Sequence, residues 1–509
     1  MSDHSVETEQ SKQSITRRSF AKKALTTTAA VAGLGSAGAL TCGWAPLRAT
    51  KAKSTTLNAI WLGASWGQAA QVMAAQYEKE TRVKVNIQLV DRDAIHSKLA
   101  LSVAGKAPYD IFNIDYSWVP EFGSANQLYS VGDLAHRMGV DVSQFIPRAL
   151  ACAEYDGRPG SWAQGGTLYG LPDTIHPQIL WYRKDIYQDA GMQKQYHAAT
   201  GSTLKPPATM DEWQAQCRFL HGKTFKGTKI YGWADQAATG FGNVHTWLMF
   251  LYSFGGQPYD WSKMQPTLTT ANAIRGTQYW VNMLKYTPPG SSSWLFSQVM
   301  AAAAQGQLAT VLLWSWGAYA LEQPKSPTKG LWDFVEVPAG TVHGVSHLGC
   351  WVNAIPKTAQ NSEEAFRFIA WLQNKQNTIK QAQLPGDTYG GDPTRIDAYQ
   401  DRSLVRSTIP GTSIRQFSRF PAVLRAMEHT LPRPYFPKEE AWEVAITADL
   451  AAAQLGQSSV RDALQRAQGH AAGVVQGLAK TVPQPGPKLP APQAKVSLSA
   501  LAKTVAAEL

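Results

Sequence analysis

The feature that most constrains the fold is an alternation of strand and helix patterns near the start of the chain. Residues 56–62, 83–90 and 109–114 have the composition and spacing of strands, and residues 68–81 and 93–105 have helical spacing of apolar side chains. Strand, helix, strand, helix, strand is a βαβ pattern, which requires a parallel sheet because each helix carries the chain back along it. The sequence therefore predicts an α/β fold.

The same pattern indicates where a ligand would bind. In open parallel sheets, ligands lie beyond the carboxyl ends of the strands. The loop after the first strand contains Ser65 and Trp66, and the loop after the third contains Asp115 and Trp118. We expect these four residues to lie at one edge of the sheet. Two of them have a structural alternative. Trp66 can be a packed loop residue, and Asp115 can be a helix cap.

Downstream, the sequence predicts strands at residues 168–172 and 178–182 on either side of a crossing segment, 173–177. A helix is expected to begin at Arg183 and to end at Gly191, because glycine commonly closes helices. Further helices are expected at 244–254, 298–305 and 362–374 and over most of 439–467, with strands at 308–314 and 351–356, Ser362 as a helix cap, and Thr209 with Glu212 as a capping box.

Residues 33–38 match the G-x-G-x-x-G pattern of dinucleotide sites, but their context argues against such a site. The pattern binds a dinucleotide when a buried strand precedes it and a helix opens after it. Here an Ala/Thr run comes before the glycines, and Pro46 follows soon after them. We therefore expect no dinucleotide cofactor.

An export signal accounts for the same region. Arg17, Arg18, Phe20 and Lys22 stand just before a weakly apolar stretch that is too short and too rich in Gly and Thr to span a membrane well. Their Arg-Arg-x-Phe-x-Lys order resembles the twin-arginine signal. We expect residues 1–49 to be a signal peptide that the twin-arginine export machinery recognises and that directs the chain to the periplasm. An ordinary secretory signal is the alternative.

The charge pattern and the motif content of the sequence argue against several functions. The formal net charge is +11, but residues 1–49 hold six basic and three acidic side chains, which leaves about +8 for the rest. No Lys/Arg block with interleaved aromatic residues is present, so nucleic acid is not an expected partner. We also find no metal-ligand cluster and no catalytic motif, and we expect neither a metal, nor a cofactor, nor an enzyme.

The four cysteines are Cys42, Cys152, Cys217 and Cys350, and none has the spacing of a zinc site. The last three are expected to be buried free thiols. A lipid anchor at Cys42 is not expected, because Thr41 stands where a lipidation site has Gly or Ala.

The unusual part of the composition is aromatic, with 18 Trp and 18 Tyr. Such residues often belong to the core. They also suit a carbohydrate site, because the apolar CH face of a pyranose ring stacks on an indole while its hydroxyls bond to Asp, Asn, His or Arg.

Six phrases, in order, resemble the extracellular solute-binding protein family 1, the ABC-importer binding proteins that include maltose-binding protein. They cover about residues 55–467. The phrases are "YDIFNIDYSWVPEFGSANQLYSVGDL", "LYGLPDTIHPQILWYRKDIYQDAGM", "PPATMDEWQ", "FSQVMAAAAQGQLATVLLWSWGAY", "GCWVNAIPKTAQNSEEAFRFIAWL" and "RPYFPKEEAWEVAITADLAAAQLGQSSVRDALQRA".

The resemblance implies a two-lobed periplasmic binding protein of type II. Each lobe has a mixed, mostly parallel sheet with flanking helices, and the lobes join at a multi-crossing hinge. The ligand lies in the cleft between them, and binding closes the cleft. The implied boundaries are 54–174 plus 347–385 for the N-terminal lobe, 175–346 plus 386–480 for the C-terminal lobe, and 481–509 for a proline-rich tail with a short helix.

The resemblance also adds candidate ligand-binding residues to Ser65, Trp66, Asp115 and Trp118. His176 falls in the crossing segment, where some members carry a carboxylate, so the pattern of ligand hydroxyls is left open. The other candidates are Asn243 and His245 before an apolar helix, Trp316, Trp351 at a lobe crossing, and Arg395.

Two features near the C-terminus stay without an assigned function. Seven arginines lie between residues 395 and 433, and we expect a solvated face, with an anionic ligand or an acidic permease surface as the alternative. Residues 481–492 hold five prolines and are expected to be extended. Residues 496–509 have amphipathic helical spacing, and that helix is expected either to dock on the body or to remain free.

Three functions compete on these grounds. The first is a substrate-binding protein that carries a carbohydrate or polyol to the permease subunits of an ABC transporter, working as a monomer. The second has the same fold but an anionic or otherwise non-sugar ligand, such as a glycerophosphodiester. The third is an exported enzyme, because twin-arginine cargo often carries redox cofactors.

Overall fold

Strand β1 (Thr56–Leu62) pairs in parallel with β2 (Lys84–Val90) on one side and with β3 (Ile111–Asp115) on the other. Helices α1 (Ser65–Thr81) and α2 (Arg92–Val103) make the two crossovers. The βαβ unit predicted from the sequence is therefore confirmed.

The structure is a computed structural model and describes residues 55–162, 165–478 and 496–509. The predicted signal peptide, Cys42 and the proline-rich segment 481–492 lie outside the described residues. What the sequence indicates for those segments stays a prediction.

The prediction of a loop around Ser65 and Trp66 is wrong, because both residues form the first turn of α1. The helix starts close behind β1, and Gly67 makes this possible. A Cβ added to Gly67 would lie 2.0 Å from the carbonyl oxygen of Leu62, so any larger residue would push the helix away from the strand. The tight turn places the Trp66 side chain at the carboxyl edge of the sheet.

Strand β6 (Gly170–Arg183) is a single strand of 14 residues, all of them buried. The sequence predicts two strands around a crossing segment here, and that prediction is wrong. The first half of β6 pairs antiparallel with β13 (Leu348–Ala354), and the second half pairs antiparallel with β11 (Thr310–Trp314) and β12 (Trp332–Val335). One long strand therefore runs through both parts of the sheet.

A β-bulge explains how β6 stays continuous in spite of Pro172. The register shifts between Trp351 and Val352, whose partners on β6 are Thr174 and Pro172. Asp173 is thus an extra residue on β6 that no residue of β13 opposes. Proline is tolerated at bulges because the ladder hydrogen bonds are already interrupted there, so Pro172 does not end the strand.

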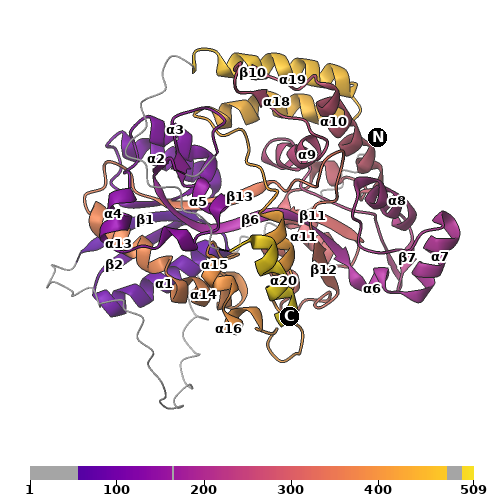
Figure 1. The fold of residues 1–509 in the computed structure, drawn as a ribbon, viewed down its shortest axis with the longest axis horizontal. Coiled ribbons are helices and arrows are strands. Elements are labelled where there is room, and N and C mark those ends of the chain that lie inside the picture. The colour runs from indigo at the N-terminus through magenta and orange to yellow at the C-terminus, as the bar shows by residue number, and fades with distance from the viewer. Residues whose placement is uncertain (1–54, 163–164, 479–495) are drawn as a thin grey trace, which may run out of the picture. The chain divides into compact units, whose positions relative to one another are not determined.

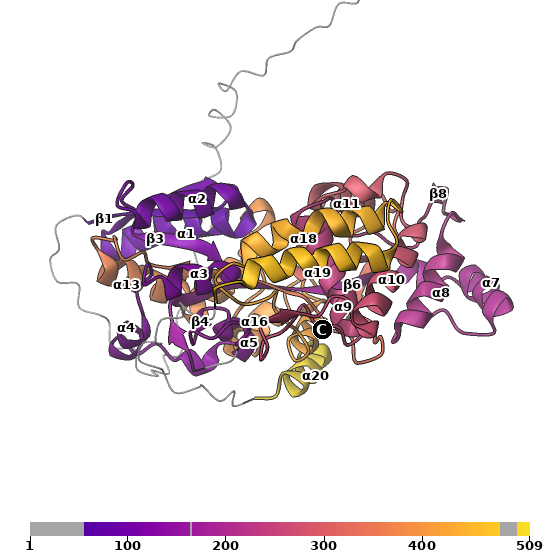
Figure 2. The ribbon, with the colours of Figure 1, turned by 90° about the horizontal axis from the view of Figure 1, so that it is seen from above.

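The strand order is β11-β6-β13-β3-β1-β2, with β12 also paired to β6. We call β1, β2, β3 and β13 with their helices the first lobe, and β11 and β12 with their helices the second lobe; β6 belongs to both (Figure 1). The two-lobed α/β class predicted from the sequence is confirmed. Helices α18 (Glu439–Gln454) and α19 (Val460–Val475) lie side by side on the second lobe (Figure 2).

The remaining helices are α3 (Val119–Ser124), α4 (Gly132–Arg137), α5 (Pro147–Ala151), α6 (Lys184–Tyr187), α7 (Ala190–Thr200), α8 (Met210–Leu220), α9 (Phe241–Ser253), α10 (Ala271–Met283), α11 (Phe296–Ala304), α12 (Ala318–Leu321), α13 (Ser362–Leu372), α14 (Lys375–Gln383), α15 (Ile396–Tyr399), α16 (Arg402–Val405), α17 (Phe420–Ala426) and α20 (Leu498–Glu508). Short strand pairs are β4 (Glu154–Tyr155) with β5 (Thr167–Leu168), β7 (Thr224–Phe225) with β8 (Thr228–Lys229), and β9 (Tyr259–Asp260) with β10 (Gln265–Pro266).

Local capping predictions have mixed outcomes. The capping box of Thr209 and Glu212 at the start of α8 is confirmed. Gly191 does not close a helix, because Asp189 caps α7 by accepting a hydrogen bond from the backbone of Met192, and Gly191 lies in the first turn. Ser362 is not a cap either, since α13 already includes it.

The arginine-rich segment is not a solvated face throughout. Arg395, Arg419 and Arg433 are buried, and each is paired with a carboxylate. Arg419 binds Asp392, beside the point where Asp392 bridges to β6. The prediction of a solvated face is therefore wrong for these three side chains.

Helix α20 docks on the body, which settles the alternatives left open for this segment. Leu498, Leu501, Ala502 and Val505 are buried, and α20 packs against α17 and α16. At the amino end of α20, Glu428 accepts hydrogen bonds from the backbone and hydroxyl of Ser499. Figures 1 and 2 both show α20 beside α16.

Three of the arginines hold the other end of α20. Arg402 and Arg406 pair with Glu508, and the Arg415 Nε donates to the carbonyl oxygen of Leu509 at 3.1 Å. Cations are stabilising at a helix carboxyl end, where the helix dipole is negative, and a carboxylate such as Glu428 is stabilising at the amino end. Part of the arginine excess therefore serves the chain's own C-terminal helix.

We expect Leu501→Asp to lower the free energy of unfolding by about 2–3 kcal/mol, because the substitution removes a buried apolar side chain and places a charge against α17. Ala506→Asp adds the same charge on the exposed side of α20 and is expected to change the value by about 0.5 kcal/mol or less. Urea denaturation of the full chain measures both values. Equal stability of the two variants would show that α20 does not contribute through its buried face.

Candidate functional site

A cavity of about 390 Å³ lies where the first and second lobes meet. It is bounded by the carboxyl end of β3, the first turns of α1 and α2, strands β6 and β13, the loop after β11, and helix α9. Six of the ten residues predicted from the sequence line it: Trp66, Asp115, His176, His245, Trp316 and Trp351.

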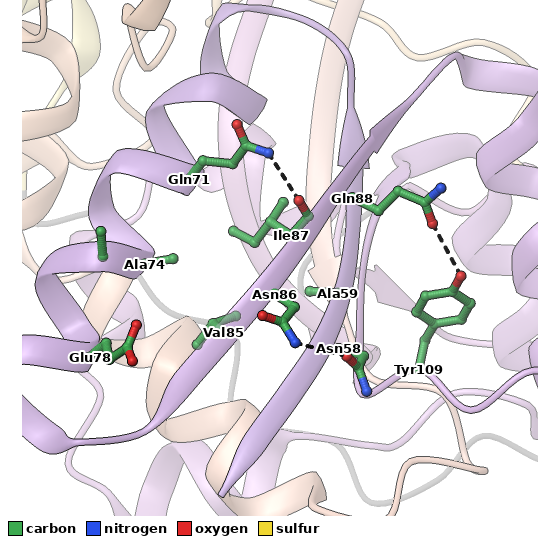
Figure 3. Close-up of a pocket in the computed structure, with 11 residues that line it drawn as sticks. Asn58, Ala59, Gln71, Ala74, Glu78, Val85, Asn86, Ile87, Gln88 and Tyr109 are labelled. Atoms are coloured by element: carbon green, nitrogen blue, oxygen red, sulfur yellow. Dashed lines mark hydrogen bonds between the residues drawn. The ribbon is translucent and has the colours of Figure 1, made fainter. Parts of the chain in front are cut away.

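A second hollow of about 560 Å³ follows the edge strand β2 beside α1 (Figure 3). Its amide and phenol side chains are already hydrogen-bonded. Gln71 donates to the carbonyl oxygen of Ile87 at 2.9 Å, and the Tyr109 hydroxyl donates to Gln88 at 3.2 Å. None of the described side chains in its lining has a buried polar atom without a partner. The interlobe cavity is therefore the better candidate.

Strand alternation explains which side chains enter the interlobe cavity. His176 on β6 lies opposite Gly349 on β13. His347, Gly349 and Trp351 are two residues apart, so they point to the same side of the sheet. Gly349 leaves room for its neighbours, because an added Cβ would lie 2.9 Å from the Trp314 ring. The side of the β6–β13 ladder that faces the cavity thus carries two imidazoles and an indole.

Aromatic rings from both lobes form the walls. Trp66 of the first lobe lies 5.3 Å from Trp316 of the second lobe, measured between ring centroids, with the planes at 83°. Trp66 also contacts Trp351 at 5.8 Å, and Phe296 stacks on Trp316 at 4.7 Å. The Trp66 indole donates a hydrogen bond to Asn113. The rings thus bring wide apolar faces from both lobes to the same cavity.

A buried ionic cluster closes one side of the cavity. Arg433 contacts Asp115 at the end of β3 and Glu443 of α18, and its Nη1 lies 3.3 Å from Glu443 Oε2. Arg92, at the start of α2, places its Nε 3.0 Å from the same Asp115 carboxylate and also pairs with Glu440 of α18. The cluster therefore ties the end of β3 to helix α18 of the second lobe.

The electrostatics of this cluster keep Asp115 and Glu443 ionised. Burial by itself raises the pKa of Asp115, but Arg433 and Arg92 outweigh it and hold the pKa below its ordinary value. The same balance lowers the pKa of Glu443, where burial is outweighed by a hydrogen bond from His245 and by the charges of Arg433 and Arg92. Asp115 also accepts a hydrogen bond from the backbone of Ser117, so it fills the capping role considered as its alternative.

Three imidazoles face the cavity, and all are kept neutral. Burial lowers the pKa of His176 to about 3. Burial also lowers the pKa of His347, with further lowering from His245 and Arg433. His245 contacts Glu443 at 3.4 Å, yet burial still lowers its pKa. At neutral pH each ring therefore offers one donor and one acceptor nitrogen.

The other four predicted residues do not line the cavity. Ser65 lies next to Trp66 with its hydroxyl buried. The Trp118 indole donates to Glu440, and the Asn243 side chain is bonded to Thr447. Arg395 is held by Asp397 and lies over the Phe145 ring, within the first lobe.

Sequence reasoning missed several residues that line the cavity. Arg92 follows the carboxyl end of β2. Because ligands bind beyond the carboxyl ends of parallel strands, its position could have identified it as a candidate. Arg433 appeared only as one of seven arginines without an assigned role. Other missed residues include Phe241, Phe296, Trp314, His347 and Gln236.

The three cysteines in the described residues, Cys152, Cys217 and Cys350, are buried and form no disulfide, as predicted. Cys350 also lines the cavity. Within the described residues, no group of His, Cys, Asp and Glu has the arrangement of a metal site, and no helix has the length and apolar content needed to cross a membrane.

Comparison with known proteins gives a consistent picture. A family model described as bacterial extracellular solute-binding protein matches residues 62–379. A probable amino-acid ABC transporter periplasmic-binding protein of Sinorhizobium fredii is 25% identical over 398 residues, which is 75% of this chain and 81% of the relative. A mannitol-binding protein of Pseudomonas aeruginosa is 25% identical over 316 residues, 60% of this chain and 68% of the relative.

Among solved structures, an ABC transporter solute-binding protein of Agrobacterium radiobacter in complex with ribitol superposes with a TM-score of 0.69 at 20% identity. The match covers 82% of this chain and 98% of that one. At this identity the likeness establishes the fold alone.

We expect Arg433→Met to lower the free energy of unfolding by about 3–5 kcal/mol, because it leaves buried carboxylates without their main cation. Arg425→Met is the control, since the Arg425–Glu336 pair is about one third exposed and such pairs contribute about 1 kcal/mol at most. Chemical denaturation measures both. A loss as small for Arg433→Met as for the control would contradict a structural role of the cluster.

Proposed function

The chain belongs to the bacterial extracellular solute-binding protein family, and from that premise we propose that it is the substrate-binding protein of an ABC importer that carries a sugar or polyol. The ligand occupies the interlobe cavity, and the loaded protein delivers it to the permease subunits outside the cytoplasm. The observation that carries this proposal is the cavity itself, with aromatic walls from both lobes and neutral hydrogen-bonding imidazoles.

The ligand class follows from the chemistry of the walls. Trp66, Trp316 and Trp351 provide the apolar faces on which the CH surface of a sugar or the carbon chain of a polyol packs. The cavity volume of about 390 Å³ is within the usual range for small-molecule sites. The mannitol-binding relative and the ribitol complex support the same class.

Closure of the cleft is part of the proposal. Strands β6 and β13 connect the two lobes, and we place the hinge there, with lobes of residues 54–174 plus 347–385 and 175–346 plus 386–480. Helices α15 and α16 fall within residues 386–480 but pack against α14 of the first lobe, so we exclude their segment from the second lobe and propose that it moves with the first. The protein acts as a monomer and binds without turnover.

We test the function by thermal-shift screening with D-mannitol, ribitol, maltose, charged sugars and amino acids, together with native mass spectrometry of the purified chain for retained ligand. A saturable shift with uncharged polyols or sugars is expected. If only amino acids or phosphorylated compounds shift the melting temperature, the assigned ligand class is wrong.

We expect Trp316→Ala to weaken binding of the polyol or sugar found in this screen at least tenfold, about 1.4 kcal/mol, because one wall of the cavity is lost. The melting temperature of the unliganded protein should change little, since Trp316 is only partly buried. Trp371→Ala, outside the cavity, serves as the control. Calorimetry that gives equal affinities for Trp316→Ala and the wild type would remove Trp316 from the site.

Export is proposed to use the twin-arginine route, on the evidence of the Arg17–Arg18 pair before the weakly apolar stretch. We expect the double substitution Arg17→Lys and Arg18→Lys to abolish export, because it removes the arginine pair while keeping its charge. Lys12→Gln lowers the charge but keeps the pair, and it should leave export unchanged. Immunoblots of periplasmic fractions measure the outcome. Normal export of the double variant would indicate an ordinary secretory signal.

A further inference from the structure

His176 and His347, which we call the imidazole pair, lie on β6 and directly before β13, the two strands that connect the lobes. The backbone of Gln178 donates to the carbonyl oxygen of His347 at 2.9 Å, so the two segments are bonded beside the pair. Both side chains line the cavity and are at least 97% buried.

Neither imidazole has a hydrogen-bond partner of good geometry among the described residues. No ring nitrogen of His176 or His347 makes a hydrogen bond of normal geometry, and each ring has only a weak backbone contact, with Ile175 and Leu431 respectively. The neighbouring rings of Trp66 and His245 pack at 4.8 Å. A buried polar group without a partner costs about 1–3 kcal/mol. The four ring nitrogens of the imidazole pair therefore lower the stability of the unliganded protein. A ligand in the cavity can offset this cost by forming hydrogen bonds with them.

The charged groups around the cavity are already matched. Arg92 is bound by Asp115 and Glu440, and Arg433 is bound by Asp115 and Glu443. An anionic ligand would have to compete with these carboxylates for the guanidinium groups. A cationic ligand would face the two arginines and the neutral imidazole pair. Arg433 Nε makes no hydrogen bond but lies 3.6 Å from the Glu439 carboxylate, and Asp93 is exposed to solvent. Most of the unmet bonding capacity of the buried lining is thus uncharged.

Resting on the function proposed above, we propose that the imidazole pair binds hydroxyl groups of the ligand and selects an uncharged, polyhydroxylated solute. A hydroxyl both donates and accepts, so one hydroxyl satisfies either nitrogen of a neutral imidazole. A carboxylate or phosphate accepts only, and an ammonium donates only. Two imidazoles at diagonal positions of adjacent strands suit hydroxyls spaced along one ligand, while the ligand's apolar faces pack on the indoles of Trp66 and Trp316.

The test exploits opposite effects on stability and on binding. His347→Phe keeps an aromatic ring but removes both unpaired nitrogens. The melting temperature of the unliganded variant should rise by about 1–4 °C, because a desolvation cost is removed. Affinity for D-mannitol or ribitol, measured by calorimetry, should fall at least tenfold. A residue with a purely structural role would lose stability on substitution, and a fall in the melting temperature would overturn the proposal.

His347→Gln is the second variant, because its amide keeps one donor and one acceptor in case phenylalanine does not fit. It should recover part of the affinity that His347→Phe loses. His176→Phe should repeat the pattern of His347→Phe. His221→Phe is the matched control, since His221 lies outside the cavity and should leave affinity unchanged. Equal affinity of His347→Phe and the wild type would also overturn the proposal.

Charged analogues separate this proposal from the function on which it rests. Mannitol 1-phosphate and glucosamine should bind the wild type at least tenfold more weakly than their uncharged counterparts, mannitol and glucose. Tighter binding of a charged analogue would overturn the selection of uncharged solutes and leave a solute-binding protein standing. If no sugar, polyol, amino acid or phosphate compound binds, the function fails, while the unliganded stabilities of the His variants still decide whether their nitrogens are unpaired.

Discussion

The contact on which the site most depends is the pairing of Arg433 with Asp115 and Glu443. Asp115 ends β3 in the first lobe, and Glu443 belongs to α18 in the second. Buried charges are stable only when they are paired, so this guanidinium both joins the lobes and fixes the position of two carboxylates. Because the ionic groups largely satisfy one another, most of the bonding capacity left for a ligand comes from the imidazoles and the aromatic rings.

A second buried network holds the strand that both lobes share. The bulge directs Asp173 inward, where Trp61, Asn113, Asn353 and Gln373 all donate hydrogen bonds to its carboxylate. Burial nevertheless raises the pKa of Asp173 to about 6, because these neutral donors replace water without adding a positive charge. The network fixes β6 against β3 and β13 just before His176, so the imidazole pair stands on a well-supported part of the backbone.

Local sequence patterns were enough to predict the βαβ unit and, through the position of strand ends, Trp66 and Asp115. The continuity of β6 was not predicted, because a bulge that depends on pairing with β13 cannot be recognised from one strand. Arg433 and His347 are brought to the cavity by contacts with residues far away in the sequence, and nothing in their local sequence marks them. Arg395 was a candidate for ligand binding, but its guanidinium group is already hydrogen-bonded to Asp397, two residues along the chain.

The same distinction between satisfied and unsatisfied groups explains the arginine-rich segment. Arg402, Arg406 and Arg415 meet the acidic end of α20, Arg419 meets Asp392, and Arg433 meets the interlobe carboxylates. A surplus of arginine in a sequence therefore need not indicate an anionic ligand, because each guanidinium can be used within the fold. The imidazole pair differs from these arginines, because the fold does not supply good hydrogen-bond partners for it. Its two histidines, of which only His176 was a candidate from the sequence, lie buried without a well-formed hydrogen bond among the described residues. A group that the fold leaves so poorly paired is where a ligand has most to contribute.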